Sequence, residues 1–398
     1  MTEIADFATI VLIAAGGFSL AILSTRITDH VPIPAPAIFL VAAAIASDLW
    51  PSLYDVPIKT VERIAVVALI VILFNGGMDI GWRRLRRSAG PVLSIGLLGT
   101  FATAGLVALF AHAVLGMSWM TAGLIGAALA PTDPAVMFSV LGGREIEGRS
   151  GTILEGEAGV NDPAGIALMI GMIELATHDD ATAWVIVREF GVEMVVGAAL
   201  GLAGAALLIP LLHRVRLPSD TLHAVFALSA AATLYGVTSV AHGSGFLAVF
   251  LFGLRLSDVE VAHQREIVRF GATLATLAEV VVFVALGLTI HLDMLSTRDW
   301  LEGAAIAVVL GLVVRPAVIA ATLARADLRG NEKAFIAWSG LKGAVPILLA
   351  AFGVLQAVDE ADRIYGIVFV VVLVSVLGQG TLVPAVARRL GIPMHAAP

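Results

Sequence analysis

Long apolar blocks separated by short polar breaks run along the whole chain. Most blocks have about twenty residues, enough for a helix to cross a hydrocarbon layer about 30 Å thick. Helices are the expected spanning form because a helix satisfies its backbone hydrogen bonds within one segment, as lipid requires. The pattern predicts an all-α polytopic membrane protein with about 13 transmembrane helices. These are expected over residues 7–25, 34–50, 61–80, 90–115, 118–141, 152–176, 184–212, 221–241, 243–256, 267–291, 300–324, 333–357 and 363–388.

Composition supports the membrane assignment. Hydrophobic residues make up 59% of the 398 residues and charged residues 14%, with a mean hydropathy of +0.96, whereas average soluble domains carry about a quarter charged residues. The absence of cysteine excludes disulfides, thiolate metal sites and thiol redox chemistry. We expect membrane lipids as surroundings, no cofactor, no nucleic-acid partner, and one transmembrane domain over 1–398 without a soluble regulatory domain.

Basic residues predict the orientation of the chain. Most of the 24 Lys and Arg fall in the C-terminal tail and in the loops after odd-numbered blocks, including the Arg83–Arg87 cluster. Cytoplasmic loops of membrane proteins carry the excess of Lys and Arg. The N-terminus is therefore expected outside and the C-terminus in the cytoplasm, with the protein in the inner membrane of a bacterium.

The number of blocks suggests an internal repeat. Thirteen helices divide into six, one connector and six, so that the second six enter the membrane with opposite topology, as is common in secondary transporters. We predict inverted repeats at approximately 7–176 and 221–390, with the connector at approximately 184–212. Two interrupted blocks stand at matching places, the fifth at residues 131–134 (Pro-Thr-Asp-Pro) and the twelfth at residues 339–343, followed by Pro346. Two ordinary proline kinks would also fit, but the coincidence of position and charge favours broken crossing helices at an ion site.

Charged side chains at membrane depth are expensive and mark functional sites. With about 1.5 Å of rise per residue, Asp162 lies near the bilayer centre. Asp133 and Lys342 fall near the middles of the interrupted blocks, and Arg315 and Glu279 near the middles of two others. A buried carboxylate such as Asp162 can hold a proton or a metal cation but not both, and this competition produces antiport when only loaded states change access. A structural charge paired with Arg315 or Lys342 is the alternative for Asp162.

Two polar residues precede Asp162 in the same block. Glu157 and Asn161 are four residues apart and share one helical face. Arg315 has no obvious partner in its own block. We expect it to pair with Glu157 and to cap Asn161, as a structural clamp rather than as the exchanging site.

The interrupted blocks supply further candidate groups. Where half-helices cross, Asp133 would neutralise positive helix N-termini and Lys342 negative C-termini. Thr132 offers a hydroxyl group and freed carbonyls beside Asp133, which are hard oxygen donors suited to an alkali cation. We therefore expect Asp162, Thr132 and Asp133 as metal-cation ligands. Glu279 is expected as an interior polar anchor or a cation funnel.

Three motifs stand out by their order and spacing. They are residues 129–136 (Leu-Ala-Pro-Thr-Asp-Pro-Ala-Val), Glu157 through Asn161-Asp162-Pro163, and residues 340–346 (Gly-Leu-Lys-Gly-Ala-Val-Pro). They resemble the monovalent cation/proton antiporters, in the branch of NhaP-type sodium/proton and potassium/proton exchangers, and the resemblance covers essentially the whole chain. It implies a thirteen-helix fold with a mobile core and a dimerisation scaffold, elevator-like alternating access, a homodimer and a role in pH homeostasis.

The resemblance also implies roles for single residues. Asp162 matches the family's ion-binding aspartate, and Asn161 matches the asparagine of an Asn-Asp pair that goes with electroneutral one-for-one exchange. The remaining matches are the broken-helix motif at Thr132 and Asp133 and the buried ion pair of Glu157 and Arg315.

Three positions depart from the family pattern. Asn75 stands where relatives often have an acidic residue, Ala158 where several have a serine, and Lys342 where arginine is more frequent. Asn75 is retained as an accessory position. The loss of two oxygen donors leaves the choice among Na⁺, K⁺ and Li⁺ open.

Other functional classes fit the sequence less well. A cation channel needs a continuous pore and no obligatory proton, so the Asn161-Asp162 pair and Arg315 fit exchange better. A sodium-coupled symporter of organic anions would need a substrate pocket, for which no distinctive polar set is visible. An intramembrane enzyme would need two carboxylates that share a site, which Asp133 and Asp162 could mimic, but the family resemblance argues against it. The hypothesis is an antiporter and not an enzyme.

Overall fold

The computed structural model describes residues 33–49, 57–141, 144–146, 148–178, 181–259 and 264–396. Within these ranges the chain is helical apart from one pair of three-residue strands, which confirms the all-α prediction. Seven helices of the described chain are long and apolar enough to cross a membrane. The expected first helix at 7–25 lies outside the described residues.

The predicted blocks between 34 and 176 all correspond to helical structure. α5, η2 and α6 form one long helix with a π-helical turn, η2, in its middle, and α4 is an additional short helix formed by arginine-rich loop residues. The elements are α2 (Ala35–Leu49), α3 (Ile58–Ile80), α4 (Trp82–Arg87), α5 (Ala89–Leu93), η2 (Ser94–Gly99), α6 (Thr100–Ala113), α7 (Trp119–Ala128), α8 (Pro134–Val140) and α9 (Arg149–Thr177).

The second part of the chain is organised in the same way. Two further π-helical turns, η3 and η4, lie inside long helices. The elements are α10 (Trp184–Arg214), α11 (Asp220–Val240), α12 (Gly245–Ser257), α13 (Gln264–Gly287), α14 (Thr297–Val309), η3 (Leu310–Val314), α15 (Arg315–Thr322), α16 (Gly330–Trp338), α17 (Ala344–Leu355), α18 (Ala361–Val374), η4 (Ser375–Gly380) and α19 (Thr381–Leu390).

Both interrupted blocks are broken helices, as predicted. Residues 129–133 separate α7 from α8, and residues 339–343 separate α16 from α17. Pro131 cannot donate a helical hydrogen bond, and Pro134 suits the first position of α8 because that position needs no N–H partner. We call the two unwound segments together the crossing, because the backbone N–H of Asp133 in one donates to the carbonyl of Leu341 in the other at 2.9 Å.

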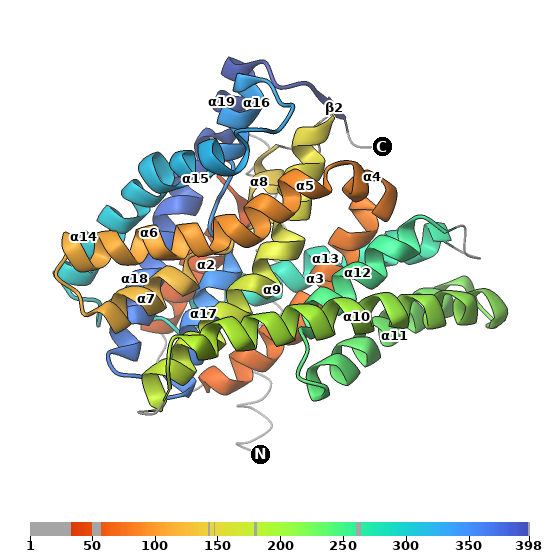
Figure 1. Ribbon diagram of the computed structural model, residues 1–398, viewed down its shortest axis with the longest axis horizontal. Coiled ribbons are helices and arrows are strands. Elements are labelled where there is room, and N and C mark those ends of the chain that lie inside the picture. Colours follow the sequence, from red (N-terminus) through yellow and green to blue (C-terminus); the bar gives the residue numbers. More distant parts are fainter. Residues whose placement is uncertain are drawn as a thin grey trace.

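Figure 1 shows α9 running through the middle of the bundle, with α10 to α13 on its right and α14, α15 and α18 on its left. Small residues allow the helices to approach closely, as is typical of membrane proteins. A Cβ on Gly77 of α3 would stand 2.9 Å from the backbone nitrogen of Leu254 in α12. α10, which the sequence analysis predicts to be the connector, is instead largely exposed, with Leu207 73% accessible, as expected for a lipid-facing helix.

The described chain has one strand pair. β1 (Arg144–Ile146) pairs antiparallel with β2 (Met394–Ala396), so that Ile146 lies opposite Met394. β1 belongs to the connection between α8 and α9. The pairing therefore ties the last described residues to the segment that leads from the crossing into the helix that carries Asp162.

Candidate functional site

Asp162 lies in the middle of α9. Its side chain is 6% exposed, and its Oδ1 atom has no hydrogen-bond partner in the described structure. The next residue, Pro163, lies inside the helix and has no N–H, so the carbonyl of Gly159 lacks its usual helical donor. α9 thus places a buried carboxylate oxygen and an under-bonded carbonyl one turn apart.

A chain of hydrogen bonds joins α9 to the crossing. The Asn161 amide donates to the Thr132 hydroxyl at 2.7 Å, and that hydroxyl donates to Glu157 Oε1 at 3.3 Å. Asn161 Oδ1 is buried and has no partner among the described residues. Asn161 Oδ1 and Asp162 Oδ1, on consecutive residues of α9, are therefore two buried oxygens that lack a donor in the described structure.

Arg315 and Glu157 form a bidentate ion pair. Nη1 and Nη2 of Arg315 donate to Oε1 and Oε2 of Glu157 at 2.5 and 2.7 Å, with both side chains at most 4% exposed. Arg315 follows the π-helical turn η3, and Gly340 of the crossing lies against it: a Cβ there would stand 2.7 Å from Cζ of Arg315. Thr132, Glu157, Asn161 and Arg315 are named the central cluster below. The expected cap of Asn161 by Arg315 is not seen: Asn161 Oδ1 accepts no hydrogen bond in the described structure, and the Asn161 amide donates to Thr132.

Lys342 holds the two unwound segments together. Its Nζ donates to the carbonyls of Ala130 and Pro131 at 3.1 and 2.8 Å, just beyond the end of α7. Its backbone N–H donates to Ser375 Oγ at 3.0 Å. The cation thus lies at the negative end of a half-helix, where the dipole and the freed carbonyls favour positive charge.

Asp133 directly precedes α8 and so lies at the positive, N-terminal end of a half-helix. Its carboxylate lies against Gly343, where a Cβ would clash with it. The crossing reaches α9 on the face of Asp162, because a Cβ on Gly165, three residues further on, would stand 2.9 Å from Cδ of Pro131. Asp133, Lys342 and Glu157 are the charged groups that act electrostatically on Asp162. Since Arg315 neutralises Glu157, an ionised Asp162 and Asp133 together leave this region with an excess of negative charge.

The two accessory candidates lie apart from the central cluster. Asn75 of α3 donates to Asp79 at 2.8 Å, one turn further along the same helix. Glu279 of α13 has a buried Oε1 atom without a hydrogen-bond partner among the described residues, and Asp133 is the charged group that acts on it. Asp133 of the crossing thus acts on Glu279, whereas the hydrogen bond of Asn75 stays within α3.

Sequence reasoning missed the polar side chains that support the crossing from apolar blocks. Ser375 accepts the Lys342 backbone N–H, and Ser339 is 2% exposed with no partner for its hydroxyl group in the described chain. A serine in an apolar helix is too common to stand out, although Ser339 borders the glycine-rich break.

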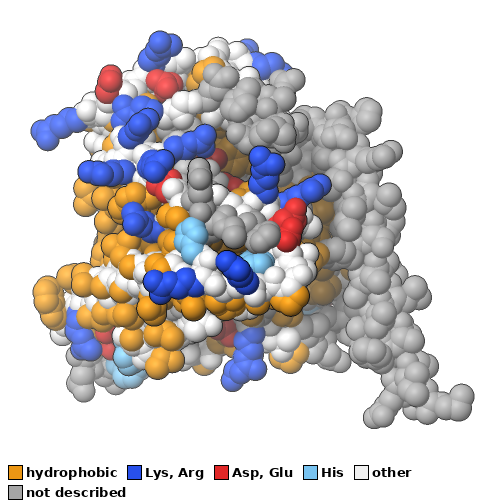
Figure 2. Space-filling view, turned by 90° about the vertical axis from the view of Figure 1, so that its right-hand side faces the viewer, with side chains coloured by type: hydrophobic (Ala, Val, Ile, Leu, Met, Phe, Trp, Pro, Cys, Tyr) orange, Lys and Arg blue, Asp and Glu red, His pale blue; other side chains and the backbone are white. Residues whose placement is uncertain are grey.

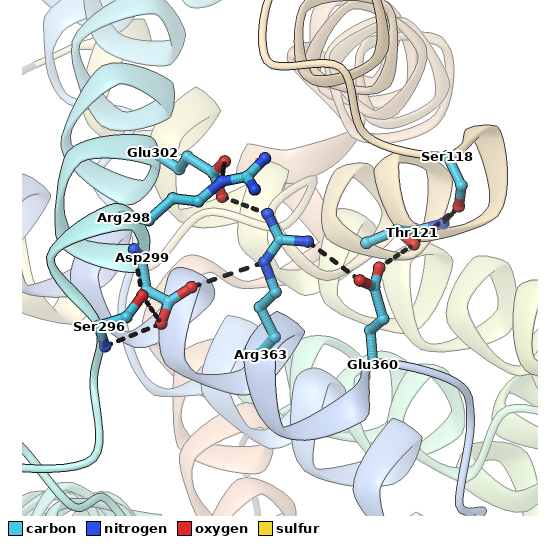
Figure 3. A network of polar contacts seen from close by, with 8 residues as sticks. All are labelled: Ser118, Thr121, Ser296, Arg298, Asp299, Glu302, Glu360 and Arg363. Atoms are coloured by element: carbon cyan, nitrogen blue, oxygen red, sulfur yellow. Dashed lines mark hydrogen bonds and ion pairs between the residues drawn. The ribbon is translucent and has the colours of Figure 1, made fainter.

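A second polar cluster, also missed, joins the beginnings of three helices (Figure 3). Arg363 of α18 donates to Glu302 of α14 at 2.7 Å and to Glu360 at 3.0 Å, and its Nε lies 3.6 Å from Asp299. Thr121 of α7 donates to Glu360 at 2.8 Å. We call these residues, with Arg298, Ser296 and Ser118, the Arg363 network. Only short-range spacings within the network, such as those of Arg298 with Glu302 and of Glu360 with Arg363, are visible in the sequence.

A membrane-embedded helical bundle with two broken helices around buried charges defines a membrane transport protein. The chain matches the family model described as "Sodium/hydrogen exchanger, transmembrane" over residues 10–389. It belongs to this family, which confirms the resemblance seen in the motifs.

Named relatives and solved structures agree with this assignment. The K(+)/H(+) antiporter NhaP of Alkalimonas amylolytica is 32% identical over 96% of this chain and 67% of its own length. The K(+)/H(+) antiporter NhaP2 of Shewanella sp. (strain ANA-3) is 30% identical over 97% of this chain and 68% of its own length. The solved structure of the sodium proton antiporter MjNhaP1 from Methanocaldococcus jannaschii matches with a TM-score of 0.80 at 22% identity, covering 98% of this chain and 99% of that one, so the two share a fold.

Proposed function

We propose that this protein is a secondary active antiporter that exchanges a monovalent alkali cation, Na⁺, K⁺ or Li⁺, for H⁺, with Asp162 binding the cation and the proton in turn. The observation that carries the proposal is the pair of buried oxygens without donors, Asp162 Oδ1 and Asn161 Oδ1, beside the crossing. The relatives support it, because their names describe K(+)/H(+) antiporters.

Burial makes Asp162 a competitive site. An unpaired carboxylate inside a membrane protein is costly, so the state that crosses the membrane is one in which a proton or a cation has neutralised it. Asn161 Oδ1 and the Gly159 carbonyl offer further oxygen ligands, which hard alkali cations prefer. We expect Thr132 and Asp133 to complete the site from the crossing.

The charge balance of the site favours electroneutral one-for-one exchange. Arg315 holds Glu157 in a bidentate pair, which removes Glu157 from the exchange. Lys342 is engaged with two carbonyls at the end of α7. Asp162 then remains as the single exchanging carboxylate, so one proton moves in one direction for each cation that moves in the other.

Symmetry in the fold supports the inverted repeats at approximately 7–176 and 221–390, with α10 as the connector. The broken helices are the fifth and the twelfth expected spans, and the π-helical turns η2 and η3 lie in the fourth and the eleventh. In space, η2 packs against α15 and η3 against α6. Alternating access would then move one group of helices against the other around the site.

Charge on the surface supports a cytoplasmic C-terminus. Lys and Arg side chains are spread over the face seen in Figure 2, with few Asp and Glu among them. This is the right-hand side of Figure 1, where α10 ends and α11 begins. By the excess of basic residues it is the cytoplasmic side, in the inner membrane of a bacterium. We further propose a homodimer, on the basis of the family resemblance.

The first test is the variant Asp162→Asn in proteoliposomes that contain a pH-sensitive dye. We expect cation-driven proton movement to be lost while the protein remains folded, because a neutral amide neither takes up and releases the exchanged proton nor supplies the negative charge that binds the cation. Asp362→Asn, an exposed aspartate at the start of α18, is the control and should exchange at the wild-type rate. Exchange at a normal rate by Asp162→Asn would contradict the role of Asp162.

The same assay with Na⁺, K⁺ and Li⁺ added in turn identifies the transported cation. Proton movement that does not depend on membrane potential would support electroneutral exchange. Current that follows the potential would contradict it, and no proton movement with any cation in folded protein would contradict antiport itself.

A further inference from the structure

Glu279 is an isolated charge in a membrane helix. It lies in α13, and no other Asp, Glu, Lys or Arg occurs between Arg269 and Asp293. Arg269 is ten residues away, or about 15 Å along the helix. A lone carboxylate at such depth is costly unless a partner neutralises it.

The surroundings of Glu279 contain another carboxylate instead of a cation. Its Oε1 atom is buried without a hydrogen-bond donor among the described residues. The charged group that acts on it is Asp133 of the crossing. Two carboxylates close enough to interact repel each other, and a cation or a shared proton that both bind relieves that repulsion.

The helices packed against α13 offer no cation at this depth. These helices are α2, α3, α11 and α17. Charged residues occur only near their ends, and α17 has none. The charged and titratable residues are Asp48 in α2, Lys59, Glu62, Arg63 and Asp79 in α3, and Asp220, His223 and the neutral phenol Tyr235 in α11.

Lys342 is the one Lys or Arg of the crossing, and its amine is already engaged with the carbonyls of Ala130 and Pro131. A purely structural ion pair for Glu279 therefore has no partner in the described chain. We propose that Glu279 is a second cation-binding carboxylate, which attracts the alkali cation to the crossing from the α13 side and shares it with Asp133. This inference rests on the proposed exchange and assigns a group on α13 to the cation's path.

The test compares cation dependence in four proteins in proteoliposomes: wild type, Glu279→Gln, Glu279→Asp and Glu193→Gln. Loss of one partly screened charge should raise the apparent KM for the cation about tenfold in Glu279→Gln, with the maximal rate within about twofold of wild type. Glu279→Asp keeps the charge on a shorter side chain, so its KM should lie between those of wild type and Glu279→Gln.

Glu193→Gln is the matched control. Glu193 is also a carboxylate in a membrane helix, α10, but the charged group that acts on it is Glu189 of the same helix and not a residue of the crossing. Its KM should equal that of wild type. An increase in KM as large as that of Glu279→Gln would show a general effect of membrane carboxylates and overturn the proposal.

A merely structural role of Glu279 predicts a different result. The variant would then melt at a lower temperature and lose maximal rate, with its KM unchanged, and this outcome overturns the proposal. If Glu279→Gln does not fold, the Glu279→Asp variant provides the test. A wild-type KM in Glu279→Asp overturns the proposal, and a raised KM supports it. Failure of the wild type to exchange any cation would contradict the proposed function instead.

Discussion

The central cluster and the Arg363 network both hold an arginine against carboxylates, but in different surroundings. In the central cluster one arginine serves one glutamate, and neither side chain is more than 4% exposed. In the network Arg363 is 24% exposed and lies within reach of three carboxylates, while Arg298 is a second partner for Glu302. If one partner is lost from the central cluster, no other charged group replaces it, whereas the Arg363 network retains other ion-pair partners.

This difference separates two uses of ion pairs. Inside the bundle, pairing Glu157 with Arg315 removes one charge from the region in which we propose that Asp162 binds the ion. At the helix beginnings, the Arg363 network joins α7, α14 and α18, and water screens the charges of Arg298 and Glu360, which are 66% and 46% exposed. We therefore expect the central cluster to be sensitive to any single change, and the network to tolerate it.

Arg315→Ala should have the largest effect on stability. It leaves Glu157 buried without a counter-charge, which costs about 3–5 kcal/mol when one partner of a buried pair is removed. Thermal unfolding in detergent should show a strongly lowered melting temperature, with ion affinity less affected in the protein that remains folded.

The double variant Glu157→Gln with Arg315→Met is the control for uncompensated charge. It should regain part of the lost stability, because no charge is left unpaired. A stable Arg315→Ala protein with selectively lost cation binding would instead place Arg315 in the ion site and weaken the contrast with the network.

Arg363→Met should have a smaller effect, of about 1 kcal/mol, because Glu302 keeps Arg298 and the other carboxylates reach water. The melting temperature should fall slightly and the exchange rate should be retained. Arg188→Met is the reference for an isolated exposed pair, since Arg188 is 65% exposed and lies 3.6 Å from Glu189. A loss at Arg363 as large as that at Arg315 would show that burial does not distinguish the two clusters.

Thr121→Val should have the smallest effect, and one that depends on pH. The hydrogen bond from Thr121 holds the pKa of Glu360 below its usual value, and Arg363 lowers it further. A lowered carboxyl pKa contributes stability above the unfolded-state pKa and loses it as the pH falls through the folded-state pKa.

The variant should therefore be less stable than wild type by about 0.5 kcal/mol at pH 7. The difference should shrink below about pH 4, where the carboxyl group becomes protonated in the unfolded chain and then in the folded protein. Melting curves across this range test it. Thr233→Val removes a hydroxyl that donates to a backbone carbonyl and should show no such pH dependence.

Much of the fold follows from local sequence. Apolar blocks of membrane-spanning length predicted the helices, and Pro131, Pro134 and the glycines at 340 and 343 predicted the breaks. The π-helical turns were not predicted, because the apolar pattern is unchanged by one extra residue in a turn. Block boundaries followed hydropathy, whereas helix ends follow caps and neighbouring segments.

The candidate site was likewise predictable from the sequence only in part. A charge in an apolar block is visible in the sequence, so Asp162, Arg315, Lys342 and Glu279 stand out by their position in the chain alone. Their partners could not be derived in the same way, since contacts such as Asn161 with Thr132 or Lys342 with Ala130 join segments far apart in the chain. The Arg363 network went unnoticed because charges at helix ends are ordinary in a membrane protein.

Sequence by itself determined that this chain is a helical membrane protein with two broken helices and charges at membrane depth. Hydrophobic length and the cost of burying charge are local properties, and each can be read along one segment. Only the tertiary structure decided which charges neutralise each other and which oxygens are left without donors. That outcome depends on how α9, α13, α15 and the crossing pack together, and the free energy of a buried charge is set by the groups around it in space.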